Sequence, residues 1–151
     1  MNPVGELLHV DDILLDVDVP DREALLERIS TLLAQRAHLS AAQVLASLEA
    51  REELGSTALG YGVAIPHARI PECAAAAGLF VRTRTGVAFD APDHRPVTLF
   101  LALLVPKQAT ERHLQLLAAA ATLFSEKALR EKLRSSSDPR TVWELLGSSP
   151  V

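Results

Sequence analysis

The feature that most constrains this fold is a run without polar alternation near the middle of the chain, Val97-Thr98-Leu99-Phe100-Leu101-Ala102-Leu103-Leu104-Val105. Successive side chains of a strand point to opposite faces of its sheet, so a strand of this composition has to be covered on both faces. The apolar stretch, extended to Pro106, is only about half of the roughly 20 residues that a membrane-spanning helix needs. The run therefore predicts the central strand of a doubly covered sheet and no membrane insertion.

Weaker patterns on either side of this run predict the other elements. Further strands are expected at Ile13–Val17, Val63–Ile65, Leu79–Thr83 and Val87–Phe89. Apolar residues at helical spacing predict two helices before the strand-rich middle and three after it. Their expected N-terminal caps are Asp21, Ser40, Thr110, Ser125 and Asp138. We interpret the chain as an α/β protein of one domain, residues 1–151: a three-layer sandwich with a mixed, mostly parallel sheet of about five strands and helices on both faces.

Three finer predictions concern the helices. Ser40 and Gln43 match a capping box, in which hydroxyl and amide satisfy each other's backbone N–H groups. Gly147 is expected to end the last helix. The helix after Thr110 is expected to bury one stripe of apolar residues, namely Leu114, Leu117, Ala121 and Phe124.

Composition excludes several classes of protein. The formal net charge is −4 over 151 residues, whereas a general nucleic-acid binder needs a basic face. The single cysteine, Cys73, excludes an internal disulfide and a zinc site built on several thiolates. The N-terminus lacks the basic region of a secretory signal. We therefore expect a cytoplasmic protein that binds no nucleic acid.

The segment from Leu54 to Arg69 departs from any regular pattern. It places Gly55, Gly60 and Gly62 within eight positions, which a helix disfavours. Glycines, together with the hydroxyls of Ser56 and Thr57, allow the close backbone approach that phosphate oxygens need. On spacing alone, a connection that needs positive φ values is the commoner interpretation. A nucleotide P-loop is excluded because the position after Gly60 is a tyrosine instead of a lysine.

Two of the five histidines stand out. His67 follows the rigid Pro66 at the end of a predicted strand, which aims its imidazole from a fixed backbone position. The other candidate, His113, lies in the first turn of a predicted helix, where free backbone N–H groups favour an anion. A turn histidine and a solvated helix residue are the ordinary alternatives. The remaining histidines are expected to be solvated: His9, His38 and His94.

Other kinds of chemistry find little support. Arg51 and Arg69 flank the glycine-rich segment, where either could neutralise a phosphoryl group or simply be solvated. A metal site on His67 and His113 would lack a clear third ligand. No G-x-S-x-G elbow supports serine hydrolysis. We therefore expect no metal and no cofactor.

Two motifs carry a resemblance to a known family: Arg51-Glu52-Glu53-Leu54-Gly55-Ser56-Thr57 and Gly62-Val63-Ala64-Ile65-Pro66-His67. They resemble the active-site signature of the bacterial phosphotransferase-system IIA domains of the fructose/mannitol type. The similarity continues through Phe89–Pro92, Leu103–Pro106 and Thr110–Leu114, so it covers nearly the whole chain in the family's order. Within the family, the chain is similar to the nitrogen-regulatory IIA branch. Tyr61 and Ala68 depart from the commonest pattern, which has Asn or Gln and Gly there.

The resemblance implies a role for each matching position. His67 matches the histidine that accepts a phosphoryl group, through Nε2, from a phosphocarrier protein resembling HPr. His113 matches a second active-site histidine that assists without being the acceptor, and Arg51 matches an arginine near the site. The phosphate-binding part of the signature corresponds to Gly55, Ser56 and Thr57.

Three functions follow as hypotheses. The first is a phosphohistidine carrier that regulates proteins of nitrogen, potassium or carbon metabolism by its phosphorylation state, favoured because no fused transporter or second carrier domain accompanies the signature. The second is a sugar-specific component that passes phosphate to a IIB protein during uptake. The third is a binding regulator in which His67 is never phosphorylated. The first two make the chain a component of phosphoryl transfer rather than a turnover enzyme on a small molecule.

Overall fold

The structure, a computed structural model, describes residues 1–108 and 110–151. Within them the sheet has six strands: β1 (Ile13–Val17), β2 (Ala58–Gly60), β3 (Val63–Ala64), β4 (His67–Ile70), β5 (Ala77–Val87) and β6 (Val97–Pro106). The predicted central strand is confirmed as β6, which is buried over most of its length. It pairs with three other strands and so connects the two halves of the sheet.

The sheet is mixed, as predicted. On one side of β6, β5 runs antiparallel to it and β1 runs parallel to β5. On the other side, β3 and β4 follow one another along β6 and are both parallel to it, while β2 is antiparallel to β3. Parallel pairings thus outnumber antiparallel ones by three to two. The strand order is β1-β5-β6-β3-β2, with β4 on β6 beyond β3.

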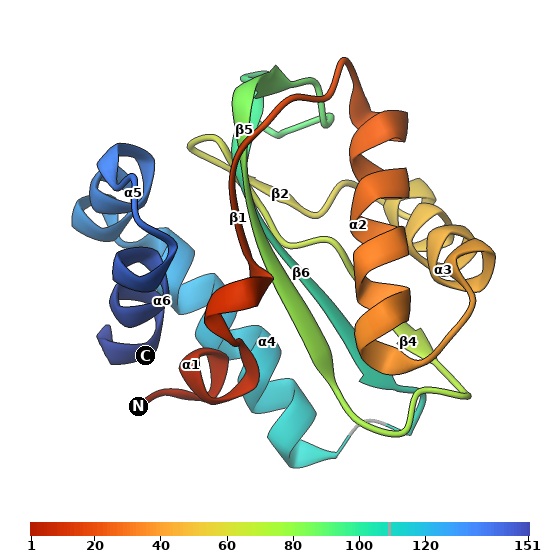
Figure 1. Ribbon diagram of the computed structural model, residues 1–151. Coiled ribbons are helices and arrows are strands. Elements are labelled where there is room, and N and C mark those ends of the chain that lie inside the picture. The colour runs from red at the N-terminus through yellow and green to blue at the C-terminus, as the bar shows by residue number, and fades with distance from the viewer. Residues whose placement is uncertain (109) are drawn as a thin grey trace.

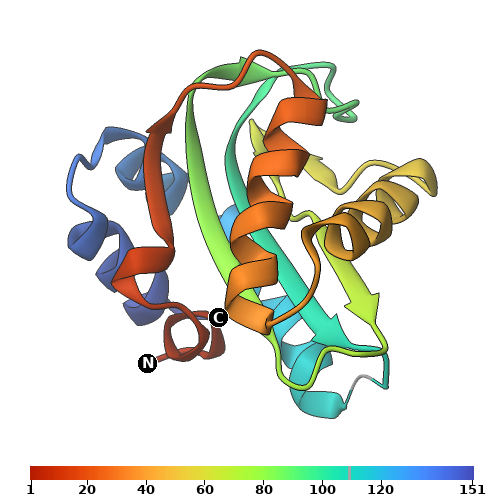
Figure 2. The ribbon, with the colours of Figure 1, turned by 45° about the vertical axis from the view of Figure 1, so that its right-hand side comes forward.

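Helices cover both faces of the sheet, as Figure 1 shows, and the rotated view in Figure 2 separates the two layers. One face carries α2 (Arg22–Ala37) and α3 (Ala41–Glu53). The other carries the remaining α-helices: α1 (Pro3–Leu7), α4 (Glu111–Ser125), α5 (Lys127–Ser135) and α6 (Pro139–Ser148). A short 3₁₀ turn, Val10–Asp12, leads into β1. None of the helices in the described residues has the length and apolarity needed to cross a bilayer. The predicted three-layer α/β sandwich is confirmed.

Alternation along β6 explains why there are two cores. Leu99, Leu101 and Leu103 pack in the cluster that includes Phe124 of α4. Phe100, Ala102 and Leu104 pack in the cluster formed with α2 and α3. Because every residue from Leu99 to Val105 is fully buried, a polar side chain at any of these positions would have no water to form hydrogen bonds with.

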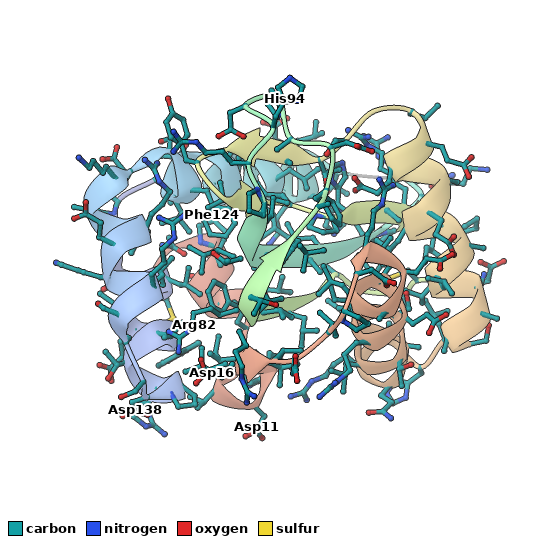
Figure 3. The ribbon with its side chains drawn as sticks, turned by 90° about the horizontal axis from the view of Figure 1, so that it is seen from above. Asp11, Asp16, Arg82, His94, Phe124 and Asp138 are labelled. Atoms are coloured by element: carbon teal, nitrogen blue, oxygen red, sulfur yellow. The ribbon has the colours of Figure 1, made fainter. Side chains whose placement is uncertain are left out.

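Two strand predictions are wrong in their boundaries. The strand expected at Leu79–Thr83 and the first residue of the strand expected at Val87–Phe89 belong to the single strand β5. Phe89 lies beyond its end. The residues between the two predicted strands, 84–86, continue the strand, and Arg82 is buried within it. Its guanidinium donates to Leu133 O at 2.9 Å and to Ser136 O, and its Nη2 lies 3.2 Å from Asp16 Oδ1. Figure 3 shows Arg82 beside Asp16. These contacts tie α5 to the sheet.

The helix caps are confirmed in part. Asp21, Ser40 and Asp138 each accept a backbone N–H from the first turn of the following helix. The capping box at Ser40 is only half formed, because the Gln43 amide donates to Glu72 Oε2 at 2.5 Å. The amide hydrogen of Gln43 is thus donated to a carboxylate outside the helix, and a charged acceptor makes such a bond stronger than a neutral one.

Three predictions on the later helices need correction. Ser125 is the last residue of α4 and donates to Thr122 O, so it does not cap α5. Gly147 lies inside α6 instead of ending it, and a Cβ there would approach Gly5 Cα to 3.1 Å. Close packing of α1 on α6 therefore explains this glycine. The stripe of α4 is also shifted, with Leu114 and Ala121 exposed; the buried residues are Leu116, Ala119, Ala120, Leu123 and Phe124.

Candidate functional site

His67 follows Pro66 beyond the end of β3, as predicted, and is the first residue of β4, a strand that the sequence did not predict. The backbone passes from β3 through Ile65 and Pro66, and Leu103 N donates to Pro66 O at 2.9 Å. His67 itself pairs with Leu103 in the parallel register of β4 and β6. The side chain is half-buried while both flanking residues are buried. The imidazole is therefore presented from a backbone that is fixed on the central strand.

The hydrogen bond of the His67 ring determines which nitrogen is reactive. Nδ1 lies 2.8 Å from Ile65 O. A carbonyl oxygen only accepts, so Nδ1 carries the hydrogen in this arrangement. In the neutral ring the lone pair then belongs to Nε2. This geometry makes Nε2 the nucleophilic atom of His67.

A buried carboxylate organises the loop that precedes this strand. Glu52, near the end of α3, is 4% exposed and accepts from Thr57 N at 2.9 Å and from Thr57 Oγ1 at 2.5 Å. Thr57 O in turn accepts from Ile65 N at 3.2 Å. A chain of hydrogen bonds thus runs from α3 through Thr57 to the residue whose carbonyl holds the His67 ring. The sequence motif contained Glu52, but no pattern around it signalled this role.

The two hydroxyls of the loop are used within the protein. Thr57 Oγ1 donates its hydrogen to Glu52, and Ser56 Oγ donates to Phe89 O at 2.5 Å while it accepts from Ala58 N at 3.1 Å. A hydroxyl has one hydrogen to donate. In this arrangement neither hydroxyl has a hydrogen left for a phosphate oxygen, so Ser56 and Thr57 shape the loop.

Arg51 and Gly55 lie at the outer side of the same loop. Arg51 Nη1 donates to Gly55 O at 2.7 Å, across the end of α3. Gly55 has a φ of +146°, a conformation that side chains with a Cβ rarely adopt, and the space beside its Cα is open. Arg69, the other flanking arginine, is exposed. The structure thus brings Arg51, Gly55, Ser56 and Thr57 together, and connects them to His67 through Ile65.

Nδ1 of His113 accepts a hydrogen bond, whereas Nδ1 of His67 donates one. His113 Nδ1 accepts from Thr110 N at 3.1 Å and lies 3.2 Å from Thr110 Oγ1, so the ring caps the first turn of α4. Because Nδ1 accepts, the hydrogen of the neutral ring is on Nε2. The two sets of bonds thus leave a lone pair on Nε2 of His67 and a hydrogen on Nε2 of His113. Within residues 1–108 and 110–151 no hydrogen bond joins the two rings; β4 and the start of α4 lie at the same end of the molecule (Figures 1 and 2).

A shallow, mostly apolar pocket of about 340 Å³ adjoins His113. Its walls come from α1, from the three alanines at 74–76 and from Leu116. Leu114, the neighbour of His113, is 48% exposed. Exposed apolar surface next to a candidate catalytic ring suits docking of another protein.

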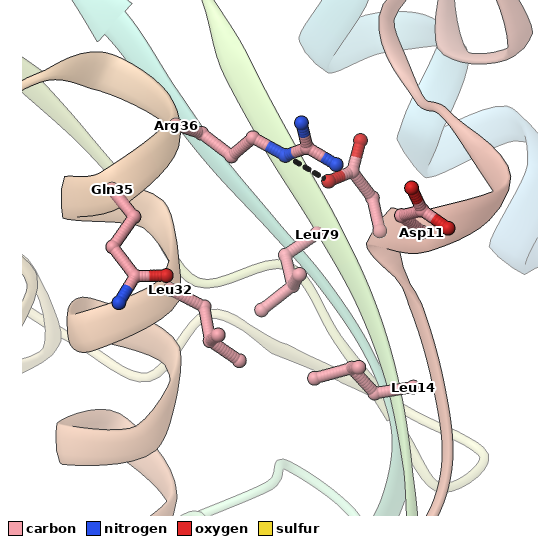
Figure 4. Close-up of a pocket in the computed structure, with 7 residues that line it drawn as sticks. Asp11, Leu14, Leu32, Gln35, Arg36 and Leu79 are labelled. Atoms are coloured by element: carbon pink, nitrogen blue, oxygen red, sulfur yellow. Dashed lines mark hydrogen bonds and ion pairs between the residues drawn. The ribbon is translucent and has the colours of Figure 1, made fainter.

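A second cavity lies between α2 and β1, and neither His67 nor His113 lines it. It has about 270 Å³ and contains the ion pair of Arg36 Nε with Asp12 Oδ1, 2.6 Å apart (Figure 4). Asp12 also accepts from His9 N at 2.8 Å and is 3% exposed. Both carboxylate oxygens are therefore satisfied, and we assign the pair a structural role.

The remaining histidines lie at the surface, and the single cysteine lies in the core. His9, His38 and His94 are exposed, as predicted. Cys73 is buried, and burial raises the pKa of its thiol. The described residues contain no cluster of three or more His, Cys, Asp or Glu side chains suited to a metal ion.

Comparison with known proteins agrees with this geometry. The family described as "Phosphoenolpyruvate-dependent sugar phosphotransferase system, EIIA 2" matches residues 6–149. A nitrogen regulatory protein of Bradyrhizobium diazoefficiens is 34% identical over 149 residues, which is 99% of this chain and 97% of that protein. The crystal structure of nitrogen regulatory protein IIA-Ntr from Neisseria meningitidis superimposes with a TM-score of 0.91 at 46% identity, covering 95% of this chain and 98% of that one. A fructose-specific EIIA component of Haloferax volcanii is 35% identical over 96 residues, 64% of this chain and 62% of that protein.

Proposed function

The chain belongs to the EIIA 2 family of the phosphoenolpyruvate-dependent sugar phosphotransferase system, and on that premise we propose that His67 is its phosphoryl acceptor. The observation that carries the proposal is the bond of His67 Nδ1 to Ile65 O, which leaves the lone pair on Nε2. An imidazole with a near-neutral pKa is both a good acceptor and a good leaving group for phosphorus. The same residue can thus receive and release the group.

The transfer step involves two nitrogen–phosphorus bonds. The lone pair of His67 Nε2 attacks the phosphorus of a phosphohistidine on an HPr-like carrier. The bond between phosphorus and the carrier's imidazole breaks, and its electron pair returns to that imidazole. His67 Nδ1 keeps its hydrogen and donates it to Ile65 O in a hydrogen bond, and this bond stabilises the positive charge of the newly substituted ring.

His113 and the loop would serve the transferred group rather than the nucleophile. The Nε2 hydrogen of His113 is suited to donate to an equatorial phosphoryl oxygen. The space beside Gly55 admits close backbone approach. Arg51 supports that loop through Gly55 O and adds positive charge near it. Phosphoryl transfer asks mainly for such positioning and charge stabilisation.

Regulation of partner proteins is the biological role that we propose for the phosphorylated and unphosphorylated forms. Its support is the set of full-length nitrogen regulatory relatives, together with the Neisseria structure. The exposed apolar surface around Leu114 and the pocket beside His113 would meet both the donor and the targets. Such encounters are transient and typically bury less than about 1,200 Å². The proposal includes a cytoplasmic location.

A second candidate is transfer to a IIB protein during sugar uptake. It is favoured by the similarity to the fructose-specific component of Haloferax volcanii, which extends over 64% of this chain. Supplying the phosphorylated chain with a sugar-specific IIB protein distinguishes the roles. Onward transfer of label would support uptake, and retention of label would support regulation.

The acceptor is tested with radiolabelled phosphoenolpyruvate, the upstream phosphotransferase enzyme and an HPr-like carrier. We expect the wild-type chain to take up acid-labile label and H67A to take up none. H94A is the matched control, because His94 is exposed and should leave labelling unchanged. Equal labelling of H67A and wild type would remove His67 from the role. Absence of labelling in all three would favour a regulator that acts only by binding.

A further inference from the structure

A cationic groove lies between α5 and the turn that joins β2 to β3. Its volume is about 390 Å³, within the range of small-molecule sites. Lys127, Arg130, Glu131 and Arg134 line one wall, at the three- and four-residue spacing that places side chains on one helix face. Arg95 lines the groove from the segment before β6.

The charge in this groove opposes that of the whole chain. Four cations and the carboxylate of Glu131 give 4 − 1 = +3 along the lining, whereas the chain carries −4. Within the described residues none of these four cations has a carboxylate within 4.0 Å. The groove is therefore a local concentration of uncompensated positive charge, which attracts anions.

Two of the cations are fixed by the fold. Arg130 is 7% exposed, donates from Nη1 to Phe124 O at 2.9 Å, and stacks its guanidinium 4.5 Å from the centre of the Tyr61 ring. Arg134 Nη2 donates to Tyr61 O. Each guanidinium has five N–H donors, so both retain donors beyond these bonds. Preorganised donors of this kind bind anions without a large ordering cost.

The pKa of Arg134 provides a second indication. Burial lowers it, and the nearby charge of Arg130 lowers it further, while Glu131 acts in the opposite direction. The two guanidiniums thus repel one another across partly desolvated space. An anion placed between them would remove that repulsion.

We propose that this groove binds the pyrophosphate group of a small-molecule anion, either free or as part of a nucleotide. Guanidinium groups match phosphate oxygens with paired hydrogen bonds. One phosphate carries about 1.5 to 2 negative charges at neutral pH, so two linked phosphates match a +3 lining better than one. The ring of Tyr61, a residue that is 65% exposed, offers a surface for the base of a nucleotide.

The groove is separate from the histidine site. Leu99 N donates to Gly62 O, beside the groove, and Leu103 N donates to Pro66 O, beside His67. Four residues along a strand correspond to about 13 Å. Binding to the groove can therefore be measured on the unphosphorylated chain, and its outcome is independent of whether His67 accepts phosphate.

The test is isothermal titration calorimetry of the full chain at low ionic strength with pyrophosphate, orthophosphate and ADP. We expect one saturable pyrophosphate site with a dissociation constant below about 1 mM, and weaker orthophosphate binding. The variant R95Q/K127Q removes two exposed cations and should weaken pyrophosphate binding about tenfold or more. K132Q/R140Q removes the same charge from exposed positions outside the groove and should bind as wild type does.

Each outcome decides the proposal. Weaker pyrophosphate binding in R95Q/K127Q but not in K132Q/R140Q supports it. Tighter binding of ADP than of pyrophosphate then identifies a nucleotide as the ligand, and equal binding identifies the pyrophosphate group alone. Equal weakening in both double variants would overturn it in favour of a net-charge effect. No saturable heat with either pyrophosphate or ADP would overturn it as well, provided that circular dichroism shows all variants folded.

Discussion

His67 and His113 are held by the same ring atom with opposite polarity. Nδ1 of His67 faces the carbonyl of Ile65, whereas Nδ1 of His113 faces the N–H of Thr110. The first bond leaves a lone pair on Nε2 and the second leaves a hydrogen there. Two identical side chains thus acquire complementary chemistry from one backbone partner each. This difference would make His67 the nucleophile and His113 the donor in the proposed transfer.

The two histidines also differ in how far their support extends. His67 is supported by the pairing of β4 with β6 and by the hydrogen bonds that run from buried Glu52 through Thr57 to Ile65. His113 depends on one helical turn that begins at Thr110. His67 is therefore coupled to the stability of the whole fold, whereas the ring of His113 is held locally and can be replaced without unfolding the protein.

Among substitutions that leave His67 in place, the largest expected effect comes from removing the imidazole of His113. We predict that H113A slows phosphoryl transfer about 100- to 1,000-fold, as loss of one preorganised donor does in other enzymes. The same change removes an N-terminal cap and should reduce the free energy of unfolding by only about 1 kcal/mol. Single-turnover transfer kinetics and urea unfolding measure the two effects.

A glutamine at position 113 sharpens this prediction. Glutamine at the third position of a helix can accept from the cap N–H while it keeps an amide donor. H113Q should therefore recover part of the transfer rate and most of the stability lost in H113A. A transfer rate for H113A equal to that of wild type would contradict the donor role.

The next effect concerns the long-range support of His67. E52A leaves the N–H and the hydroxyl of Thr57 buried without their acceptor, and we predict a loss of about 2–4 kcal/mol in the free energy of unfolding. E53A, at the exposed neighbouring position, should change it by less than about 0.5 kcal/mol. Urea denaturation of both variants makes the comparison. Similar midpoints for the two would mean that the buried carboxylate does not support the loop.

The parts of the fold that were predictable depend on local signals. β6 followed from its composition, and the caps at Asp21 and Asp138 followed from a polar residue before an apolar stripe. The strands β2 and β4 were missed because three or four residues carry no periodicity and are defined by pairing with β3 and β6. β5 was divided into two predicted strands because its exposed residues 84–86 carry no apolar signal, and its continuity is defined by pairing with β6.

The sequence named the residues of the proposed site but not how they are held. The motif singled out His67, His113 and the loop, and the hydroxyls of Ser56 and Thr57, which were expected to face phosphate, are bonded within the protein. Glu52 had no predicted role because its function depends on burial, which no pattern in its neighbourhood signals. Hydrogen-bond polarity at the two rings is likewise a property of the folded backbone.

A smaller effect is expected at Arg51, which contacts the loop from its exposed side. R51Q removes the bond to Gly55 O and should reduce the free energy of unfolding by about 0.5–1 kcal/mol and the transfer rate by less than about tenfold. R28Q, on the exposed face of α2, is a charge-matched control. A loss of transfer as large as that of H113A would show that Arg51 contacts the phosphoryl group directly.

The smallest effect is expected at Asp93, which bonds Tyr61 at the start of the segment that leads to His67. Asp93 Oδ2 accepts from Tyr61 N at 2.9 Å, and this bond, followed by that to Arg95 N, holds the pKa of the carboxyl below its ordinary value of 3.8. Because the folded pKa is the lower one, the ionised carboxylate stabilises the fold above that ordinary value, and the contribution is lost as pH falls through the folded pKa. Urea midpoints of wild type and D93N should therefore differ near neutral pH and converge in acid; D11N, at an exposed carboxylate near the N-terminus, is the matched control for the loss of a surface charge. A difference between wild type and D93N that is constant with pH would mean that Tyr61 is held by the shape of the turn rather than by the charge of Asp93.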